Sequence, residues 1–208
     1  MLLATDQLID LDSTLFSGQC FRWRRKGLWF DGVILDNRVQ IRPAIGGLEF
    51  ISSPNKEETF EPILRNYLGL DTDLETVYGS LRHDKRLAAS IAKYPGMRLL
   101  RQDPWECLIS FICSSASNIK RISRNIESIC TTFGHPIKMG GSVRHSFPSP
   151  EDLTNTKVET LRSLGLGYRS EYLVDTICAV SDGTVDLISL RSMPYPRALN
   201  SLVSLPGV

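Results

Sequence analysis

The chain has 208 residues and a formal net charge of +1, with 42% hydrophobic and 23% charged residues. This balance is typical of one large or two small globular domains and argues against a disordered chain. No apolar run is long enough to cross a membrane, and Asp6 interrupts the amino terminus before a signal-peptide core can form. We therefore expect an intracellular protein without a membrane partner. The five cysteines lack CxxC or zinc-ligand spacing, which indicates reduced thiols.

The first fifty residues predict an antiparallel meander. Large apolar and charged side chains alternate over Cys20–Arg24, and tight-turn residues follow at Lys26–Gly27, Asp36–Asn37 and Gly46–Gly47. Short strands joined by such turns, with no helix between them, fit an antiparallel sheet. The predicted strands span residues 20–24, 28–35, 38–45 and 48–52.

After Pro54 the apolar spacing changes to that of helices. Asp103-Pro104-Trp105-Glu106 is a helix start, and the run from Trp105 to Cys113 is apolar on every side, which predicts a buried central helix. The next helix has a buried stripe of Ile119, Ile122, Ile126, Ile129 and Phe133. Its opposite face carries Lys120, Arg121 and Arg124. The other predicted helices lie near residues 60–68, 72–81, 84–93, from 149, 170–181, 184–192 and 195–203.

These elements predict an α+β fold in which a small amino-terminal antiparallel sheet, in a domain spanning residues 1–100, packs on a helical domain spanning 101–208. Charge is unevenly spread along the chain, with a change near residue 84. Residues 1–84 hold 9 basic and 13 acidic side chains, whereas residues 85–208 hold 15 and 10. A basic carboxy-terminal part permits a polyanionic partner without requiring one.

Five short segments could carry chemistry, and each also has a structural interpretation. Gly18 is a turn residue, or it lets a ligand approach the backbone closely. The run Arg22–Lys26 is a solvated strand edge, or its tryptophan and arginines stack nucleobases. The segment Ser114–Arg124 is a helical corner, or it presents amides and cations to phosphates.

The last two segments lie further along the chain. Tyr168-Arg169, after two turn glycines, is an ordinary helix start or a wedge between stacked bases. Pro206-Gly207 stops a helix, or it begins a helix-hairpin-helix whose amides hold a phosphate. The three histidines are scattered without ligand spacing, and no phosphate-cradling loop or nucleophile elbow is present.

Taken in order, seven segments of the chain resemble the 8-oxoguanine DNA glycosylase family of the helix-hairpin-helix superfamily. The resemblance covers nearly the whole chain, and the ordered combination is far more specific than any single segment. The segments are Ser17-Gly-Gln-Cys-Phe-Arg-Trp23, Leu99-Leu-Arg-Gln-Asp-Pro-Trp-Glu-Cys-Leu108, Ser110-Phe-Ile-Cys-Ser-Ser115, Asn118-Ile-Lys-Arg-Ile122, Phe147-Pro-Ser149, Leu164-Gly-Leu-Gly-Tyr-Arg169 and Leu205-Pro-Gly-Val208.

The resemblance implies a base-excision repair enzyme that flips 8-oxoguanine out of duplex DNA, cleaves its glycosidic bond and has Schiff-base AP lyase activity. By resemblance, the Gly18 carbonyl accepts a hydrogen bond from N7–H of the damaged base. Tyr168 wedges the stack beside the orphaned cytosine, and Arg169 and Arg121 donate to the cytosine edge. Asn118 lies at the same loop–helix junction.

The resemblance also implies that the turn at Gly207 holds backbone phosphate. The carbonyls of Val203, Leu205 and Val208 are candidates to bind a structural monovalent or divalent cation, and no other cofactor is expected. The implied partner is duplex DNA with 8-oxoguanine opposite cytosine, bound by a monomer in the nucleus of a eukaryote or the cytoplasm of a bacterium.

The sequence departs from the family pattern in two places. Ala116 occupies the position where the family commonly has the asparagine that fills the space left by the flipped base. The family's catalytic lysine and aspartate follow the hairpin turn and would fall beyond Val208, so the chain is expected to be an inactive amino-terminal fragment. Two alternatives are an alkylpurine DNA glycosylase of the same superfamily and a non-catalytic damaged-DNA-binding module.

Overall fold

The computed structural model describes all 208 residues, and the chain forms two compact units. The first comprises residues 1–102 and 137–142, and the second comprises residues 103–136 and 143–208. No helix has the length and apolar character that crossing a membrane requires. The prediction of an α+β fold is confirmed.

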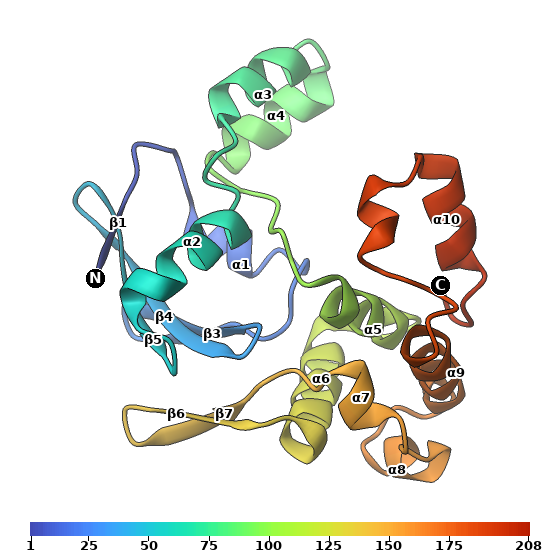
Figure 1. The fold of residues 1–208 in the computed structure, drawn as a ribbon. Coiled ribbons are helices and arrows are strands. Elements are labelled where there is room, and N and C mark those ends of the chain that lie inside the picture. The colour runs from blue at the N-terminus through green and yellow to red at the C-terminus, as the bar shows by residue number, and fades with distance from the viewer. The chain divides into compact units, whose positions relative to one another are not determined.

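The first unit is built on a five-stranded antiparallel sheet in the order β1-β5-β4-β3-β2 (Figure 1). The meander prediction is confirmed for the three central strands, each of whose ends differs from the expected one by one residue. Adjacent strands are in register through Phe30, Ile41 and Phe50, all of them buried. The strands are β1 (Leu2–Ala4), β2 (Arg24–Lys26), β3 (Trp29–Ile34), β4 (Asn37–Ala44) and β5 (Gly47–Ser53).

The prediction of a strand over Cys20–Arg24 is wrong, because that segment is irregular and β2 begins only at Arg24. Arg22 and Trp23 are both buried, so the segment does not alternate between a core side and a solvent side as the half-buried strand predicted from the sequence would. The Trp23 indole donates to the Tyr67 hydroxyl at 3.0 Å. Gly32 makes room for this ring, since a Cβ at that position would lie 2.5 Å from it.

Four helices belong to the first unit: α1 (Leu11–Leu15), α2 (Glu57–Tyr67), α3 (Leu74–Leu81) and α4 (Lys85–Lys93). The helix α2 packs on the sheet through Phe60 and Leu64, which are fully buried in the same core as Phe50. The helices α3 and α4 form a separate pair (Figure 1), and α4 has no buried residue. The sequence analysis missed α1, which has only five residues and depends on the Asp10 cap.

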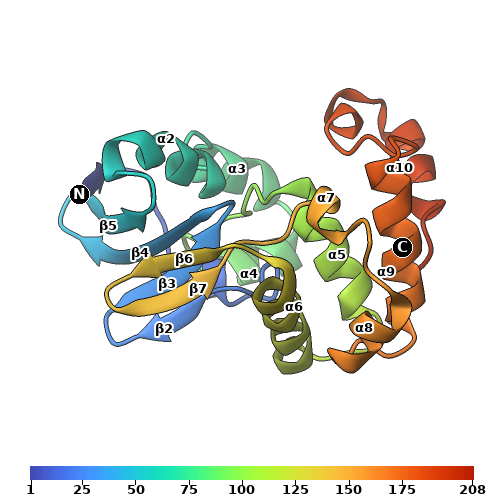
Figure 2. The same ribbon diagram turned by 60° about the horizontal axis from the view of Figure 1, so that its bottom comes forward.

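A second, two-stranded sheet was also missed, formed by β6 (Pro136–Met139) and β7 (Ser142–His145). Its tip, residues 137–142, belongs to the first unit and lies along the five-stranded sheet (Figure 2). Arg38 Nη1 donates to the carbonyl oxygens of Met139 and Ser142 at 3.1 and 3.0 Å. Ser53 Oγ donates to the Lys138 carbonyl oxygen at 2.8 Å. These contacts fix the tip of the hairpin to the end of the sheet where β4 begins and β5 ends.

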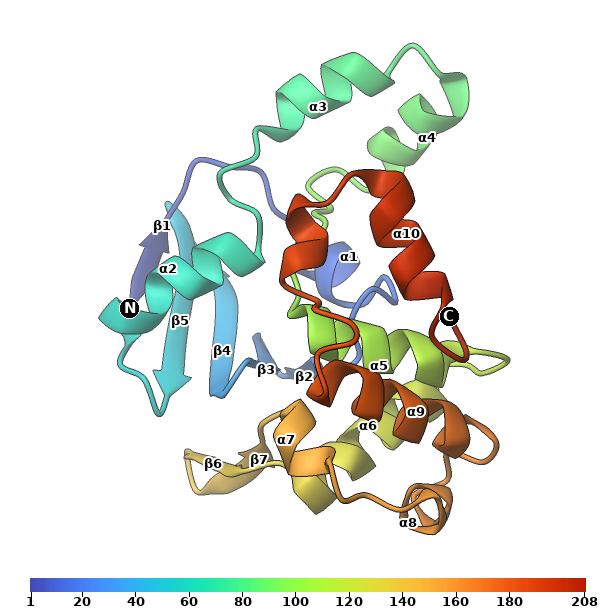
Figure 3. The same ribbon diagram turned by 45° about the vertical axis from the view of Figure 1, so that its right-hand side comes forward.

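The second unit is helical (Figure 3). The helix α5 is central and packs against α6 and α9. Its elements are α5 (Pro104–Ser114), α6 (Ile119–Phe133), α7 (Pro150–Leu153), α8 (Val158–Ser163), α9 (Arg169–Ser181), the 3-10 helix η1 (Ser189–Ser192) and α10 (Tyr195–Val203).

The predictions for this unit need four corrections. Phe133, predicted on the buried stripe of α6, is only partly buried. Phe111 on α5 is 55% exposed, so that helix is not buried on every side. Ile119 is 56% exposed because it lies in the first turn of α6, where the helix emerges from the core. The helix expected over residues 184–192 is only a 3-10 turn over its last four residues. The helix α8 was not predicted.

Candidate nucleic-acid interface

A loop in the second unit joins α5 to α6 and holds an unusual backbone conformation. Ala116 has a φ of +45°, in the left-handed region that L-residues other than asparagine and aspartate rarely adopt. Asn118 ends the loop as the N-cap of α6, and its Oδ1 accepts the Arg121 N–H at 3.0 Å. Backbone conformation and a helix cap thus define the α5–α6 loop, residues 115–118.

Arg169 stabilises this loop from the first turn of α9. Its Nε donates to the Ser115 carbonyl oxygen at 2.9 Å, and its Nη2 donates to the carbonyl oxygens of Ser115 and Ala116. Nη1 donates to the Leu166 carbonyl oxygen at 3.4 Å. Arg169 is only 2% exposed, and its rigid fork of N–H donors matches several carbonyl groups at once.

Tyr168 lies beside this arginine and is 48% exposed. The Arg169 guanidinium carbon is 4.6 Å from the centre of the Tyr168 ring, and Tyr172 contacts the ring edge-on at 5.8 Å. The Tyr168 hydroxyl lies 3.5 Å from Ser115 Oγ. Arg169 and Tyr172 thus hold the Tyr168 ring in place, while about half of its surface faces solvent. A side chain that inserts into a base stack needs such an exposed and fixed ring.

Arg121 completes the cluster from the outer face of α6. It is exposed, and its Nη2 donates to the Gly165 carbonyl oxygen at 3.4 Å, which links α6 to the turn before α9. Gly165 and Gly167 have φ values of +89° and +61°, so this turn depends on glycine. Lys120 and Arg124 are exposed on the same helix.

The chain's last turn, residues 205–208, packs against the same cluster. Gly207 has a φ of +87°, and a Cβ there would lie 2.7 Å from Tyr172 Cδ2. Tyr172 therefore contacts both the Gly207 turn and the Tyr168 ring. We call the assembly of Ser115–Asn118, Arg121, Gly165–Arg169, Tyr172 and Gly207 the loop cluster.

Gly18 belongs to the first unit and lies in an irregular segment after α1. Its φ of +89° requires glycine. Gln19 holds this segment in place, because its Nε2 donates to the carbonyl oxygens of Thr14 and Arg98 at 2.8 and 2.9 Å. Its Oε1 accepts the Leu100 N–H at 2.9 Å. The stacking hypothesis for Trp23 is wrong, since the core buries that ring.

The loop cluster contains no lysine, cysteine, histidine, aspartate or glutamate side chain. Cys113, fully buried at the end of α5, is the thiol closest in sequence to the loop. Burial raises the pKa of Cys113 to about 12, an effect that the charge of Arg169 only partly offsets. The thiol therefore stays protonated at neutral pH. No group of three or more His, Cys, Asp or Glu side chains could hold a metal ion.

Comparison with known proteins decides the family. The sequence profile of the 8-oxoguanine DNA glycosylase N-terminal domain matches residues 1–108. A probable N-glycosylase/DNA lyase of Methanothermobacter thermautotrophicus is 30% identical over 96% of this chain and 72% of its own length. The chain belongs to the 8-oxoguanine DNA glycosylase family.

Eukaryotic members of the family are also similar to the chain. N-glycosylase/DNA lyase OGG1 of Arabidopsis thaliana is 31% identical over the whole chain and 59% of its own length. The Saccharomyces cerevisiae N-glycosylase/DNA lyase is 39% identical over 80% of the chain and 48% of its own length. The chain thus spans about half to three-fifths of these two relatives.

Solved structures of the glycosylase family share the fold. MBOgg1 in complex with a low-affinity DNA ligand matches 98% of this chain and 71% of its own, with a TM-score of 0.92 and 32% identity. A Clostridium acetobutylicum 8-oxoguanine glycosylase/lyase, bound to DNA with cytosine opposite 8-oxoG, matches with a TM-score of 0.90 and 27% identity. The 3-methyladenine DNA glycosylase of Archaeoglobus fulgidus, at 18% identity, shares the fold alone.

The loop cluster contains two contributors that the sequence analysis did not identify. Ser115 supplies the carbonyl oxygen that accepts from Arg169, a backbone contact without a side-chain signal. Tyr172 had a signal, because it stands four residues after Tyr168 and one helical turn away on the same face of α9.

Proposed function

We propose that this chain provides the lesion-recognition part of an 8-oxoguanine DNA glycosylase with AP lyase activity. The observation that carries the proposal is the loop cluster. Residues that match separate family segments, Asn118, Arg121, Tyr168, Arg169 and Gly207, lie together in one folded unit. The relatives include an N-glycosylase/DNA lyase and an 8-oxoguanine glycosylase/lyase bound to DNA, which supports the substrate class.

Gly18 would distinguish the damaged base from guanine. Guanine has a hydrogen-bond acceptor at N7, whereas 8-oxoguanine carries a proton there, so a carbonyl oxygen attracts one base and repels the other. The positive φ of Gly18 and the bonds that hold Gln19 preset such a carbonyl before any ligand arrives. A side chain at residue 18 would strain the backbone and obstruct the approach of the base.

The loop cluster would bind the opposite strand. Tyr168, exposed along one side, would wedge into the stack where the lesion leaves it. Arg121 would donate to the cytosine edge. Its guanidinium is exposed, and its hydrogen bond to the Gly165 carbonyl oxygen is long and therefore easily exchanged. Arg169 would share this task by replacing its hydrogen bonds to the loop carbonyl oxygens with hydrogen bonds to acceptors on the cytosine.

The turn at Gly207 would hold a backbone phosphate through its amides. The carbonyl oxygens of Val203, Leu205 and Val208 are of the type that hard cations prefer, but three oxygens fall short of the six to eight that Ca²⁺ takes. The Leu205 oxygen also accepts the Val208 N–H at 3.3 Å. These residues alone do not complete a cation site, and no step of the proposed function depends on one.

Binding to a lesion-containing duplex tests the proposal. The 208-residue chain should bind a labelled duplex with 8-oxoguanine opposite cytosine more tightly than the matching guanine–cytosine duplex in fluorescence anisotropy. The Arg121→Ala variant should weaken lesion binding about tenfold, the order of one bidentate base contact. It should also reduce the salt dependence of binding if the guanidinium displaces counterions.

Arg82→Ala is the matched control, because Arg82 is an exposed arginine at the end of α3 in the first unit and lies outside the loop cluster. It removes the same charge and should leave lesion preference unchanged. Equal affinity for both duplexes, together with equal effects of the two variants, would contradict the proposal and favour a non-specific DNA-binding module. A preference for a methylated adenine over 8-oxoguanine would favour the alkylpurine alternative.

We further expect the protein to act as a monomer, inside the cell and with the DNA. The compartment follows from the substrate, which is nuclear in a eukaryote and cytoplasmic in a bacterium. Sedimentation of the chain with its lesion duplex at a ratio of one to one would support the monomer.

A further inference from the structure

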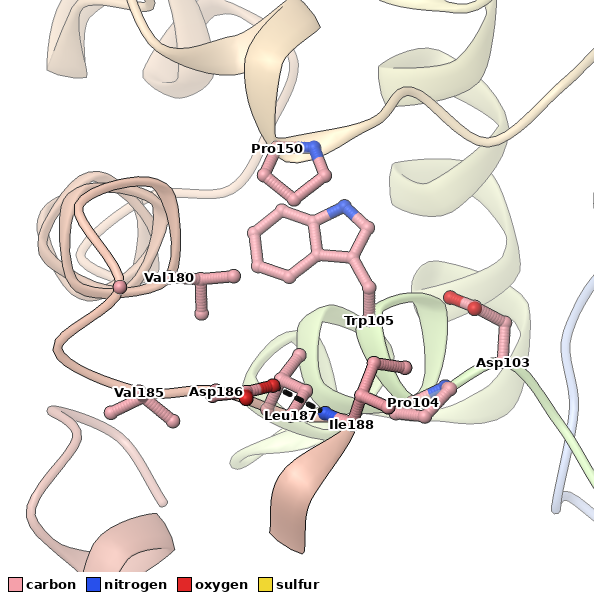
Figure 4. Close-up of a pocket in the computed structure, with 10 residues that line it drawn as sticks. Asp103, Pro104, Trp105, Pro150, Val180, Val185, Asp186, Leu187 and Ile188 are labelled. Carbon is pink, nitrogen blue, oxygen red and sulfur yellow. Dashed lines mark hydrogen bonds between the residues drawn. The ribbon is translucent and has the colours of Figure 1, made fainter. Parts of the chain in front are cut away.

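A cavity of about 300 Å³ opens beside the first turn of α5, within the second unit and outside the loop cluster (Figure 4). No residue proposed to bind DNA lines it. Its walls come from the start of α5, from Pro150 of α7, and from the end of α9 with the segment that follows. The lining residues are Asp103, Pro104, Trp105, Pro150, Val180, Gly183, Val185, Asp186, Leu187 and Ile188.

The walls of the cavity are mainly apolar and hold one fixed aromatic ring. The Trp105 indole lies between Pro150 and Val180 (Figure 4), and its Nε1 donates to the Pro148 carbonyl oxygen at 3.0 Å. This bond satisfies the only polar atom of the indole. Trp105 is 7% exposed, so the small part of its surface that reaches the cavity is apolar. Ile188, 71% exposed, adds an apolar side chain that no neighbouring element covers.

Two carboxylates accompany this apolar surface. Asp103 caps α5, its Oδ1 accepting the Glu106 N–H at 3.0 Å. Asp186 caps the turn that leads into η1, its Oδ1 accepting the N–H groups of Ile188 and Ser189 at 3.0 and 3.2 Å. Each aspartate uses its Oδ1 for the cap. Backbone amides carry no net charge, so both carboxylates keep their negative charge. The cavity therefore combines negative charge with apolar walls, which disfavours a phosphate and favours a cation.

We propose that this cavity binds a segment of a partner protein that carries one bulky apolar side chain next to a lysine or arginine. The apolar side chain would pack on Trp105, and the cation would lie beside Asp103 and Asp186. The volume is at the low end for ligand pockets and suits one anchoring side chain better than a whole cofactor. Small protein interfaces obtain specificity from such an apolar anchor together with neighbouring charges that orient the partner. The proposal does not depend on DNA binding.

Three dipeptides test the proposed chemistry, with the Trp105 indole N–H signal in ¹H–¹⁵N NMR spectra as the reporter. Trp105→Phe identifies this signal among the three tryptophans of the chain. Acetyl-Leu-Lys-amide should shift it with an affinity in the millimolar range, as expected for a single anchor. Acetyl-Leu-Glu-amide, which reverses the charge, and acetyl-Gly-Lys-amide, which lacks the anchor, should each bind at least fivefold more weakly.

The double variant Asp103→Asn/Asp186→Asn should reduce the affinity for acetyl-Leu-Lys-amide about fivefold, while the asparagines retain both caps. Asp182→Asn is the matched control, because Asp182 caps the same segment through Thr184 N–H at 2.9 Å and does not line the cavity. It should leave the affinity unchanged.

Three results would overturn the proposal. The first is the absence of any shift of the Trp105 signal at about 10 mM acetyl-Leu-Lys-amide, beyond the affinity of a single anchor. The second is equal binding of all three peptides. The third is a shift of the same signal with protein concentration alone, which would mean that a second copy of the chain occupies the cavity.

Discussion

Asp31 is a fully buried carboxylate in the sheet of the first unit. Its two oxygens accept Arg38 Nε and Nη2, each at 2.9 Å, and Lys26 Nζ lies 2.7 Å away. Burial opposes ionisation and would raise the pKa of Asp31, but the bonds to Arg38 and Lys26 outweigh it and hold the pKa below its ordinary value of 3.8. Since Arg38 also binds the carbonyls of the β6–β7 tip, one ion pair fixes both the sheet and the hairpin.

Removing the charge of Asp31 should therefore destabilise the chain. We expect Asp31→Asn to lower the free energy of unfolding by roughly 3–5 kcal/mol at pH 7, because it leaves the buried Arg38 guanidinium without a counter-charge. The native carboxylate is stabilised only while it is ionised. Its contribution is complete above the unfolded-state pKa of about 3.8 and is lost as the pH falls through the lower folded-state pKa. Urea titrations at pH 7 and below pH 4 measure both effects.

Glu49→Gln is the matched control, because Arg42 and Glu49 form a pair across two strands of the same sheet at 2.5 Å but are each more than a third exposed. Exposed pairs contribute about 0–1 kcal/mol, so this variant should change stability little at either pH. A similar cost for the two variants, or a deficit in Asp31→Asn that does not shrink in acid, would contradict the role assigned to the buried pair.

At the scale of elements, local signals predicted the long helices well. Asp103-Pro104 begins α5, Asn118 caps α6, and Ile122, Ile126 and Ile129 are its buried face. These signals lie within one or two turns of the residues they specify.

The elements that the sequence did not predict depend on distant contacts. The hairpin of β6 and β7 has only four residues in each strand, and its tip is held by Arg38, about a hundred positions earlier in the chain. The same limit applies to the site. The sequence supplied the residues of the loop cluster, whereas the bonds of Arg169 to the loop carbonyls involve backbone atoms that no side-chain pattern reveals.

The left-handed backbone conformation of Ala116 allows the role of the α5–α6 loop to be tested by substitution. This alanine has a φ of +45°, which costs L-residues about 1–2 kcal/mol and asparagine less. Ala116→Asn should therefore stabilise the loop, and it would restore the amide that, by resemblance to the family, fills the space left by the flipped base. We expect this variant to bind the duplex with 8-oxoguanine opposite cytosine several-fold more tightly, measured by fluorescence anisotropy.

Ala116→Gly separates the two reasons for that gain. Glycine adopts the left-handed conformation without strain but has no amide to offer the DNA. It should change lesion affinity by much less than asparagine does. Equal gains in the two variants would show that relief of backbone strain, and not a contact to DNA, controls this loop.

At the scale of the whole molecule, the proposed function assigns recognition and chemistry to different parts of the chain. Gly18 lies in the first unit and the loop cluster in the second, so each compact unit holds one element of the proposed recognition. Resemblance to the family puts the nucleophilic lysine just after the hairpin turn, and Lys120 and Lys157 stand on other elements, at the start of α6 and before α8. Cys113, protonated at neutral pH, does not replace that lysine.

Borohydride trapping tests directly whether the nucleophile lies within the 208 residues. A lysine that displaces the base forms a Schiff base with the sugar, and reduction converts it into a stable protein–DNA adduct. We expect the 208-residue chain to bind a duplex with 8-oxoguanine opposite cytosine but to form no adduct on a denaturing gel. An extended chain with a lysine after the hairpin turn should form one. An adduct with the 208 residues alone, abolished by Lys120→Ala or Lys157→Ala, would show that these residues hold their own nucleophile and would overturn the division between recognition and chemistry.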